Sequence, residues 1–171
     1  MIRLKKEKNI VTNQNTLKIF YWQISENEFQ IIKNILIHTY GAIFDIVNGR
    51  ELKLHPQAYN RQRNQYDAER LLRFLLTKTK DMTLWIINQD LYTKDMNFIF
   101  GLAYYFQGAV LSFFRLSTKE LREKEAIHEI GHVLGLHHCT NPCAMQYSNS
   151  LWEAQMKPLF LCENCRRKLN I

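Results

Sequence analysis

The sequence of 171 residues does not begin with charged residues followed by an apolar run, as a secretion signal would. It also has no apolar stretch long enough to cross a bilayer. Nothing addresses the chain to export or to a membrane, so we expect a cytoplasmic location. Internal repeats, low-complexity tracts and long linkers are also absent. With 46% hydrophobic residues, a chain of this length can bury one core without needing two independent domains. We expect a single domain over residues 1–171.

Cysteine is absent before position 139 and occurs four times after it, at Cys139, Cys143, Cys162 and Cys165. A Cys-x-x-x-Cys and a Cys-x-x-Cys joined by a loop are typical of a tetrahedral structural zinc site, which accounts for every thiol. Two disulfides are the alternative, but they suit a secreted chain and no secretion signal is present. No cysteine precedes Cys139, so we do not expect the kind of latency in which an upstream cysteine blocks a catalytic zinc ion.

The formal net charge of +7 allows two interpretations. A solvated basic surface is favoured over a footprint for nucleic acid or acidic peptides, because the basic residues form no single stripe interleaved with aromatics. Some of them offset the net negative charge of a zinc ion held by four thiolates. The basic residues gather at Arg3, Lys5, Lys6 and Lys8, at Arg61, Arg63, Arg70 and Arg73, and at Arg166, Arg167 and Lys168.

Hydrophobic patterning predicts alternating strands and helices after a frayed polar arm over residues 1–15. The alternation implies a mostly parallel sheet with right-handed crossovers, helices packed on it and one short strand at an edge. Strands are expected at residues 17–24, 42–47, 83–88, 97–100 (the edge strand) and 109–114, and helices at residues 26–40, 66–76, 118–134 and 164–169.

Local signals place several of these boundaries. Ser25 with Glu28, and Ser117 with Glu120, have the spacing of capping boxes that open the first and third helices. Gly41 is placed to end the first helix, and Asn48-Gly49 is placed to close the second strand.

The most informative stretch carries five residues at fixed offsets: His128, Glu129, His132, Gly135 and His138. Residues four apart share a helix face, so the imidazoles of His128 and His132 can converge on one ion. A left-handed residue at Gly135 can reverse the chain and return His138 as a third ligand. The fourth coordination position is then open for water. A surface helix with solvated histidines is the alternative, and the length of the motif disfavours it.

This arrangement points to a zinc hydrolase. Neutral imidazoles leave the ion its full charge, so a bound water ionises near neutral pH and a substrate carbonyl is polarised. Glu129 is placed to take the proton of the attacking water and pass it to a leaving amine, acting as general base and then general acid.

The motif continues into a turn with a methionine, the signature of metzincin peptidases. Within that clan the chain resembles the archaemetzincins, which carry a cysteine directly after the third histidine, a second cysteine just before the turn methionine, and a distant Cys-x-x-Cys. Here these are Cys139, Cys143 before Met145, and the pair Cys162 and Cys165. Each gap is about one residue shorter here than in the family.

The resemblance implies an α/β (α+β) fold: a mixed, mostly parallel five-stranded twisted sheet with backing helices and an active-site helix. It also implies an N-terminal subdomain over about residues 1–135 and a small zinc-stabilised C-terminal subdomain over about 136–171. Two zinc ions are expected, one catalytic and one structural. A peptide or protein substrate would pair in extended form with the edge strand at residues 97–103.

Five further residues need an interpretation. Met145 would form a hydrophobic floor under the metal. Tyr147 either packs in the core or approaches the zinc. His137 is a flanking group rather than a ligand, and we assign no role to His38 or His55.

Three functions are compatible with these features. A zinc-dependent peptidase leads. A peptide-binding module that holds both zinc ions without turnover is second, and the intact Glu129 argues against it. A nucleic-acid-binding zinc protein is the third and least favoured. We expect the protein to be a monomer. Its substrate preference does not follow from the sequence, because it depends on the loops that line the site.

Overall fold

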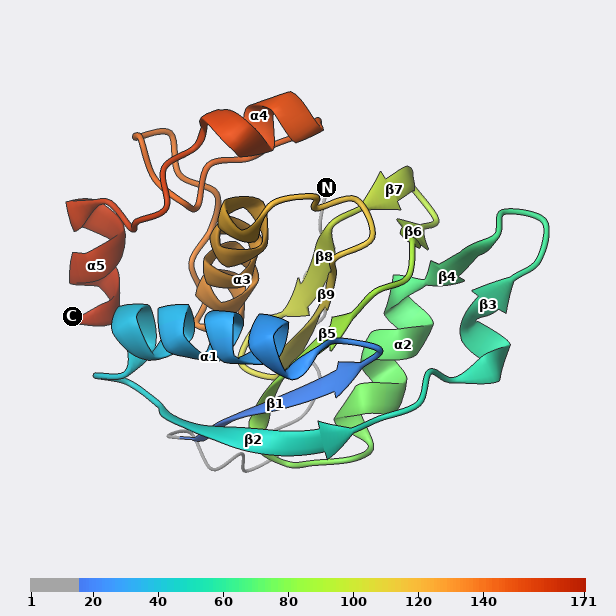
Figure 1. Cartoon of the computed structure of the whole chain (residues 1–171). Helices are drawn as coiled ribbons and strands as arrows, with labels where there is room; N and C mark the ends of the chain where they lie inside the picture. Colours follow the sequence, from blue (N-terminus) through green and yellow to red (C-terminus); the bar gives the residue numbers. More distant parts are fainter. Residues whose placement is uncertain (1–15) are drawn as a thin grey trace.

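The computed structural model describes residues 16–171, and a five-stranded sheet lies at its centre (Figure 1). The strand order is β2-β1-β5-β9-β8, with the first four strands parallel and β8 antiparallel to β9. This confirms the predicted mixed, mostly parallel sheet of five strands. The strands are β1 (Thr16–Trp22), β2 (Asp45–Glu51), β5 (Met82–Ile87), β8 (Gly101–Tyr104) and β9 (Gly108–Ser112).

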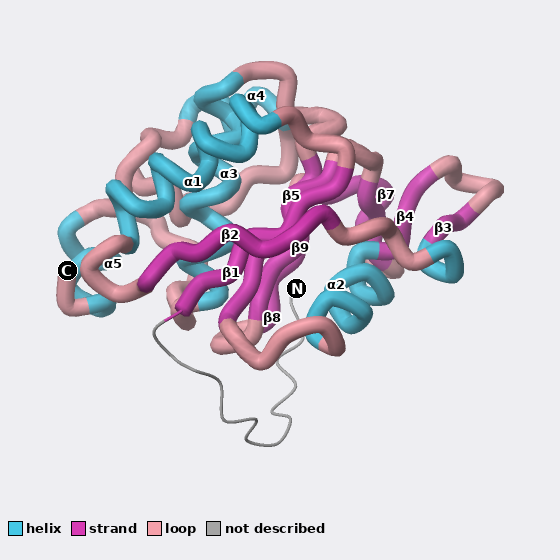
Figure 2. Tube along the Cα trace, turned by 60° about the horizontal axis from the view of Figure 1, so that its bottom comes forward, coloured by secondary structure: helices cyan, strands magenta, loops and turns pink. Residues whose placement is uncertain are grey.

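Helices cover both faces of this sheet (Figure 2). Helices α1 (Glu26–Tyr40) and α3 (Lys119–Val133) pack on one face, and α2 (Ala68–Leu76) packs on the other. Strand β5 shows how one run serves both layers, because alternate residues of a strand point to opposite faces. Leu84 lies in the core under α1 and α3, whereas Trp85 lies in the core against α2. The apolar run at β5 is therefore buried throughout.

Capping fixes the starts of the two helices on the first face. Ser25 and Glu28 form the predicted capping box of α1. For α3 the predicted box is wrong by one residue. Thr118 is the cap, and its hydroxyl accepts from the Leu121 backbone, while Glu120 pairs with a lysine on the next turn. A threonine hydroxyl is as able to cap a helix as a serine hydroxyl, and Thr118 does so without a capping box, because Leu121 stands three residues after it.

A second, smaller sheet lies beside the first and was not predicted. Its order is β3-β4-β6-β7, from β3 (Tyr59–Asn60), β4 (Gln65–Asp67), β6 (Leu91–Thr93) and β7 (Met96–Ile99). The segment expected as the edge of the main sheet, residues 97–100, instead belongs mostly to β7, and the edge of the main sheet is β8. The predicted start of the second helix at residue 66 is also wrong, because residues 65–67 pair as β4 and Asp67 caps α2.

Buried polar groups hold this smaller sheet against the larger one. The carboxylate of Asp90 accepts two hydrogen bonds of 2.7 Å from the Arg115 guanidinium and one of 2.9 Å from the Gln65 amide. Burial raises the pKa of Asp90, but the hydrogen bonds from Arg115 and Gln65 outweigh it and lower the pKa overall. The network satisfies a buried charge that periodic patterning does not detect.

Strand β2 lies three residues further along the chain than predicted, and Asn48-Gly49 lies inside it instead of closing it. Pairing with β1 explains the shift, because Gly49 packs directly on that strand. A Cβ at Gly49 would lie 2.7 Å from the Ile19 carbonyl oxygen, so the glycine serves close strand approach and not a turn.

After α3 the chain has only short regular elements, α4 (Leu151–Met156) and α5 (Glu163–Leu169). Helix α5 confirms the predicted terminal helix; α4 was not predicted. Buried residues of this segment, including Ala144, Met145 and Leu161, join the core under α1 and α3. The division into subdomains near residue 135 stays a prediction. The expected arm at residues 1–15 lies outside the described residues. No helix within residues 16–171 has the length and apolar content that a bilayer crossing requires.

Candidate metal centre

Helix α3 presents the candidate site residues along one buried stripe. His128, Glu129 and His132 are all buried, and the spacing of four places the two imidazoles on the same face. Their Nε2 atoms lie 3.0 Å apart. The helix itself is fixed from behind, because the Tyr40 hydroxyl of α1 donates a 2.7 Å hydrogen bond to the Ile127 carbonyl.

Backbone carbonyls set the orientation of both imidazoles. His128 Nδ1 lies 2.9 Å from the Ala144 oxygen, and His132 Nδ1 lies 2.7 Å from the Leu136 oxygen. A carbonyl accepts but never donates, so each Nδ1 carries the proton and each neutral ring leaves its Nε2 lone pair free. Two lone pairs facing each other at 3.0 Å repel unless a cation lies between them. Donation from Nδ1 to a backbone carbonyl is a common way in which a protein orients metal-binding histidines.

The chain reverses directly after α3 at Gly135, whose φ is +90°. The Leu136 amide donates to the Gly131 carbonyl and the Gly135 amide donates to the His132 carbonyl, both at 2.9 Å, which is the Schellman pattern of a helix end. A Cβ at Gly135 would also lie 2.8 Å from the Phe106 ring. Both the backbone conformation and the packing therefore require glycine here.

The reversal brings His138 back to the other two imidazoles. One nitrogen from each of His128, His132 and His138 lies within 4.8 Å of the others. The His138 ring centroid is 5.3 Å from that of His128 and 4.9 Å from that of His132. The Tyr147 ring centroid is 4.8 Å from that of His138, and Tyr147 is about half exposed.

Burial keeps these imidazoles neutral. It lowers the pKa of His128 well below its usual value, lowers that of His132 to about 4, and lowers that of the partly exposed His138. Removing a charged imidazolium from water costs free energy, so the neutral form is favoured. The neutral form is the one that binds a metal ion.

The carboxylate of Glu129 lies in a dry position against the edge strand. Burial, together with the neighbouring Glu125 carboxylate, raises the pKa of Glu129 to about 8, although the positive charge of Lys157 opposes the rise. A Cβ at Gly101, the first residue of β8, would lie 2.6 to 2.7 Å from the Glu129 side chain. Gly101 therefore makes room for this carboxylate, a close approach that only glycine allows.

Met145 lies beneath the helix and is fully buried. A Cβ at Gly131 would collide with its sulfur, so the absence of a side chain at Gly131 lets the methionine pack against α3. The Met145 carbonyl accepts a 2.9 Å hydrogen bond from the Cys139 amide, which closes the loop that carries His138.

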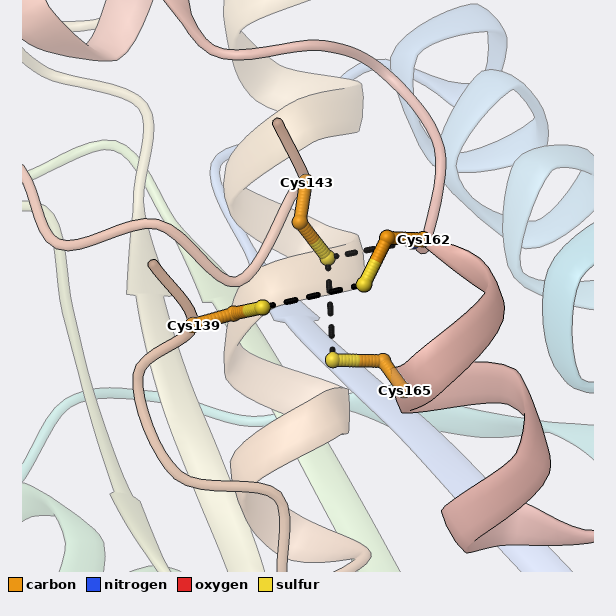
Figure 3. A group of neighbouring side chains, drawn as sticks. All are labelled: Cys139, Cys143, Cys162 and Cys165. Atoms are coloured by element: carbon orange, nitrogen blue, oxygen red, sulfur yellow. Dashed lines mark hydrogen bonds between the residues drawn. The ribbon is translucent and has the colours of Figure 1, made fainter. Parts of the chain in front are cut away.

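The four cysteines form a second cluster (Figure 3). Cys139 and Cys143 come from the loop after α3, and Cys162 and Cys165 come from the start of α5. All four point toward one another, with their sulfurs within 4.8 Å. The Cys139 and Cys162 sulfurs are 3.6 Å apart, and those of Cys143 and Cys165 are 3.7 Å apart. A disulfide requires about 2.05 Å, and none of the four thiols is bonded to another.

Hydrogen bonds favour the thiolate at Cys162, whereas burial raises the pKa of Cys143 and of Cys165 in the absence of a metal ion. The Cys162 amide donates to the Cys143 sulfur at 3.2 Å, and the Asn141 amide lies 3.8 Å from the Cys162 sulfur. Burial opposes ionisation of Cys162, but hydrogen bonds from the Cys165 backbone and the Cys139 thiol outweigh it and lower its pKa to about 6. Thiolates are the form that binds zinc.

Both clusters suit zinc by donor type and spacing. A tetrahedral zinc ion places its nitrogen ligands about 3.3 Å apart and its sulfur ligands about 3.8 Å apart. The observed separations of 3.0 Å between imidazole nitrogens and 3.6 to 3.7 Å between paired sulfurs are close to these values. Three imidazoles leave a fourth position open, as in catalytic zinc sites, whereas four sulfurs fill all positions, as in structural ones.

The remaining histidines lie outside both clusters. His137 Nδ1 is 2.9 Å from the Tyr105 hydroxyl, and the Tyr105 ring lies beside His132. His55 caps the short 3-10 helix Pro56–Ala58 through a 3.2 Å hydrogen bond from the Gln57 amide. His38 is an exposed residue of α1.

Several features near the site were not predicted: the close approach of Gly101 to Glu129, the position of Tyr105, and the buried pair of Glu125 and Lys157. A sequence signal exists for Glu125, which is one helical turn before Glu129 on the same face. Gly101 opens a strand, and that position alone gives no indication of the carboxylate it accommodates. Nothing in the local sequence marks Lys157.

An imidazole triad on and just beyond one helix, packed on a mixed five-stranded sheet and followed by a methionine turn, defines the metzincin class of zinc metallopeptidases. The sequence model that describes peptidase family M54 matches residues 18–171 of this chain. The chain belongs to this family, whose members include the archaemetzincins.

Relatives and solved structures agree with this assignment. The archaemetzincin of Nanoarchaeum equitans is 44% identical over 124 residues, covering 72% of this chain and 73% of that protein. The archaemetzincin of Archaeoglobus fulgidus is 38% identical over 162 residues, covering 90% and 99%. A crystal structure of the A. fulgidus protein with malonate has a TM-score of 0.82 at 35% identity, covering 90% of this chain and 99% of that one. The Methanopyrus kandleri archaemetzincin has a TM-score of 0.80 at 28% identity, covering 94% and 97%.

Proposed function

We propose that this protein is a zinc-dependent endopeptidase or exopeptidase that hydrolyses peptide bonds at the imidazole triad. The convergence of three neutral imidazoles beside a buried carboxylate, which has no ion-pair partner among residues 16–171, is the observation that carries the proposal. His128, His132 and His138 would hold the zinc. A zinc ion there supplies Lewis acidity, which polarises a substrate carbonyl and lowers the pKa of water.

Glu129 is the proposed general base and general acid. Its carboxylate takes the proton of the attacking water and then passes it to the leaving amine. A dry environment suits this role, because burial raises the pKa of the carboxyl above its usual value and so makes the carboxylate a stronger base.

Cys139, Cys143, Cys162 and Cys165 are the proposed ligands of a second, structural zinc. Because His138 and Cys139 are adjacent in the chain, the two metal sites would share one backbone segment. The Cys139 amide bonds the Met145 carbonyl, and the Ala144 carbonyl orients His128, so this segment also supports the first site. The structural zinc therefore fixes the groups that orient the catalytic ligands.

The substrate is proposed to bind in extended form along β8. This strand is last in the order of the main sheet, so its outer backbone edge has no strand partner among residues 16–171. Strand addition at a sheet edge supplies main-chain hydrogen bonds without requiring a particular sequence. Gly101 at the start of β8 lies against Glu129, and this nearness of the strand to the proposed general base supports the assignment.

The test is Glu129→Gln, assayed with a random peptide library and by zinc content. Glutamine keeps the shape of the side chain but cannot accept the proton, so we expect turnover to fall by at least about 1000-fold while the zinc content stays at the parental value. A Glu129→Gln protein with parental turnover would contradict the assigned role. A parent protein that binds zinc but cleaves no peptide would instead favour the peptide-binding alternative.

A further inference from the structure

A second carboxylate lies on the stripe of α3 that carries the site, and it is paired with a buried lysine. Lys157 Nζ is 2.6 Å from Glu125 Oε1, and the two side chains are 1% and 3% exposed. Apart from this contact, neither of these two atoms has a hydrogen-bond partner in the described part of the chain. An ammonium group can donate three hydrogen bonds, so this pair is not explained by a saturated structural network.

The pair joins the proposed catalytic helix to the segment that follows the methionine turn. Glu125 precedes Glu129 by one helical turn and shares its face. Lys157 is the C-cap of α4, which lies beside the N-terminal half of α3 (Figure 1). Shortly after Lys157, the Phe160 carbonyl accepts from the Ala144 amide, and the Ala144 carbonyl orients His128. The lysine therefore stands at the start of a segment that reaches the metal site.

Without Lys157, the dry stripe would carry two unpaired carboxylates one turn apart. Like charges at this spacing repel each other, and burial strengthens the repulsion. The Glu125 carboxylate would be free to turn toward a cation held by His128, since glutamate three residues before histidine is a known metal-binding spacing. Such a turn would displace Glu129 from its working position.

We propose that Lys157 is a positioning residue of the peptidase reaction: its ammonium holds the Glu125 carboxylate away, so that Glu129 is the one carboxylate on this face of α3 free to meet the attacking water. This inference rests on the proposed function. In a purely structural role, Lys157 would affect only the stability of the fold. Here it affects turnover, because it restrains the Glu125 carboxylate.

The test compares Lys157→Met with the double variant Lys157→Met/Glu125→Met in the zinc-loaded full chain. The single variant leaves Glu125 buried and unpaired, and we expect kcat to fall about 100-fold, as for a small misplacement of a reacting group, with KM changed less than about threefold. Replacing both charges by apolar groups of similar size removes the competing carboxylate and leaves no orphaned charge. We expect the double variant to regain kcat to within about fivefold of the parent.

Lys124→Met is the matched control. Lys124 is also a buried lysine that links the same two helices, since its ammonium donates to the Gln155 carbonyl at 2.8 Å and pairs with Glu120 at 2.6 Å. Glu120, however, is largely exposed and lies two turns or more before Glu129. We expect Lys124→Met to lower the melting temperature by several degrees, roughly as Lys157→Met does, while kcat stays within about threefold of the parent.

Two results would overturn the inference. One is parental kcat in folded, zinc-loaded Lys157→Met. The other is a folded, zinc-loaded double variant whose kcat is as low as that of Lys157→Met, which would assign the effect to the lysine itself. If Met at both positions prevents folding, Lys157→Met/Glu125→Gln carries the same two outcomes. An inactive parent would refute the proposed function; an active parent with indifferent Lys157 variants would refute this inference alone.

Discussion

Residues 16–133 and residues 136–171 are held together by different kinds of contact. The first region buries aliphatic and aromatic side chains on both faces of a sheet, with fully buried residues such as Trp85, Leu84 and Leu72. The second has two helices of six and seven residues. It also carries large apolar side chains in solvent, including Trp152, Met156 and Phe160 at 67%, 68% and 61% exposure.

The contrast indicates where the proposed structural zinc would take over part of the role of a core. A segment of this length with few buried apolar groups cannot offset its conformational entropy by burial alone. Four thiols lie within 4.8 Å of one another, and a zinc ion bound by them would supply the missing constraint, because zinc binding couples directly to folding. The imidazole triad lies at the boundary: His128 and His132 come from the first region, and His138 comes from the second.

The largest expected effect comes from Cys162→Ser, which removes one thiolate of the proposed structural site. We expect the variant to lose that zinc, and to bind the second zinc at least tenfold more weakly, because the loop that carries His138 loses its anchor. Zinc content and competition with a chelator measure both effects. A variant that loses one zinc and keeps the other at parental affinity would show that the two sites are independent.

Leu84→Ala is the matched control in the first region. It should cost about 3 kcal/mol of unfolding free energy through the cavity it creates, without changing the zinc content. A loss of zinc in this variant would mean that zinc binding also depends on the hydrophobic core of the first region, which contradicts the comparison.

A smaller effect is expected from pH in the metal-free protein. The pKa of His132 is about 4 when folded and about 6.5 when unfolded, so the unfolded state binds more protons between these values. Stability is therefore full above about pH 6.5 and falls as the pH drops toward 4, by about 3 kcal/mol for this group. The background should be Glu129→Gln, because the raised pKa of Glu129 acts with the opposite sign.

Urea unfolding of metal-free Glu129→Gln, with and without His132→Asn, isolates this contribution. The two proteins should have parallel stability curves above pH 6.5 and diverge below it. Curves that stay parallel down to pH 4 would mean that His132 is not held in a dry environment.

The smallest effect is expected from Tyr147→Phe. The Tyr147 ring contacts the His138 ring, but the residue is about half exposed and no hydrogen bond from its hydroxyl to another residue is found within residues 16–171. We expect kcat to change less than about fivefold, with unchanged zinc content. A fall in kcat of a hundredfold or more, with KM unchanged, would instead give the hydroxyl a part in stabilising the transition state.

Spacing in the sequence was sufficient to predict features that depend on one element or one turn. The helix with His128 and Glu129, the left-handed residue at Gly135 and four strands of the main sheet follow from periodicity and turn chemistry. The fifth strand was expected at residues 97–100 and lies instead at Gly101–Tyr104. The sequence did not distinguish between two adjacent capping residues: Ser117 was predicted to cap the third helix, and Thr118 caps it.

Features that depend on contacts between distant segments were not predictable. The smaller sheet consists of strands of two to four residues, which carry no periodic signal, and it depends on Asp90 meeting Arg115 and Gln65. Asn48-Gly49 has the composition of a turn but packs within a strand. Lys157 reads as an ordinary surface lysine until the fold places it beside Glu125.

The most direct measurement is the number of zinc ions bound per chain, determined by elemental analysis of the parent and of His128→Asn/His132→Asn. Two ions in the parent and one in the variant, the latter retained by the four cysteines, are the expected result. Fewer than two ions in carefully prepared parent protein, or a variant that loses both, would contradict the division into a catalytic imidazole site and a structural thiolate site.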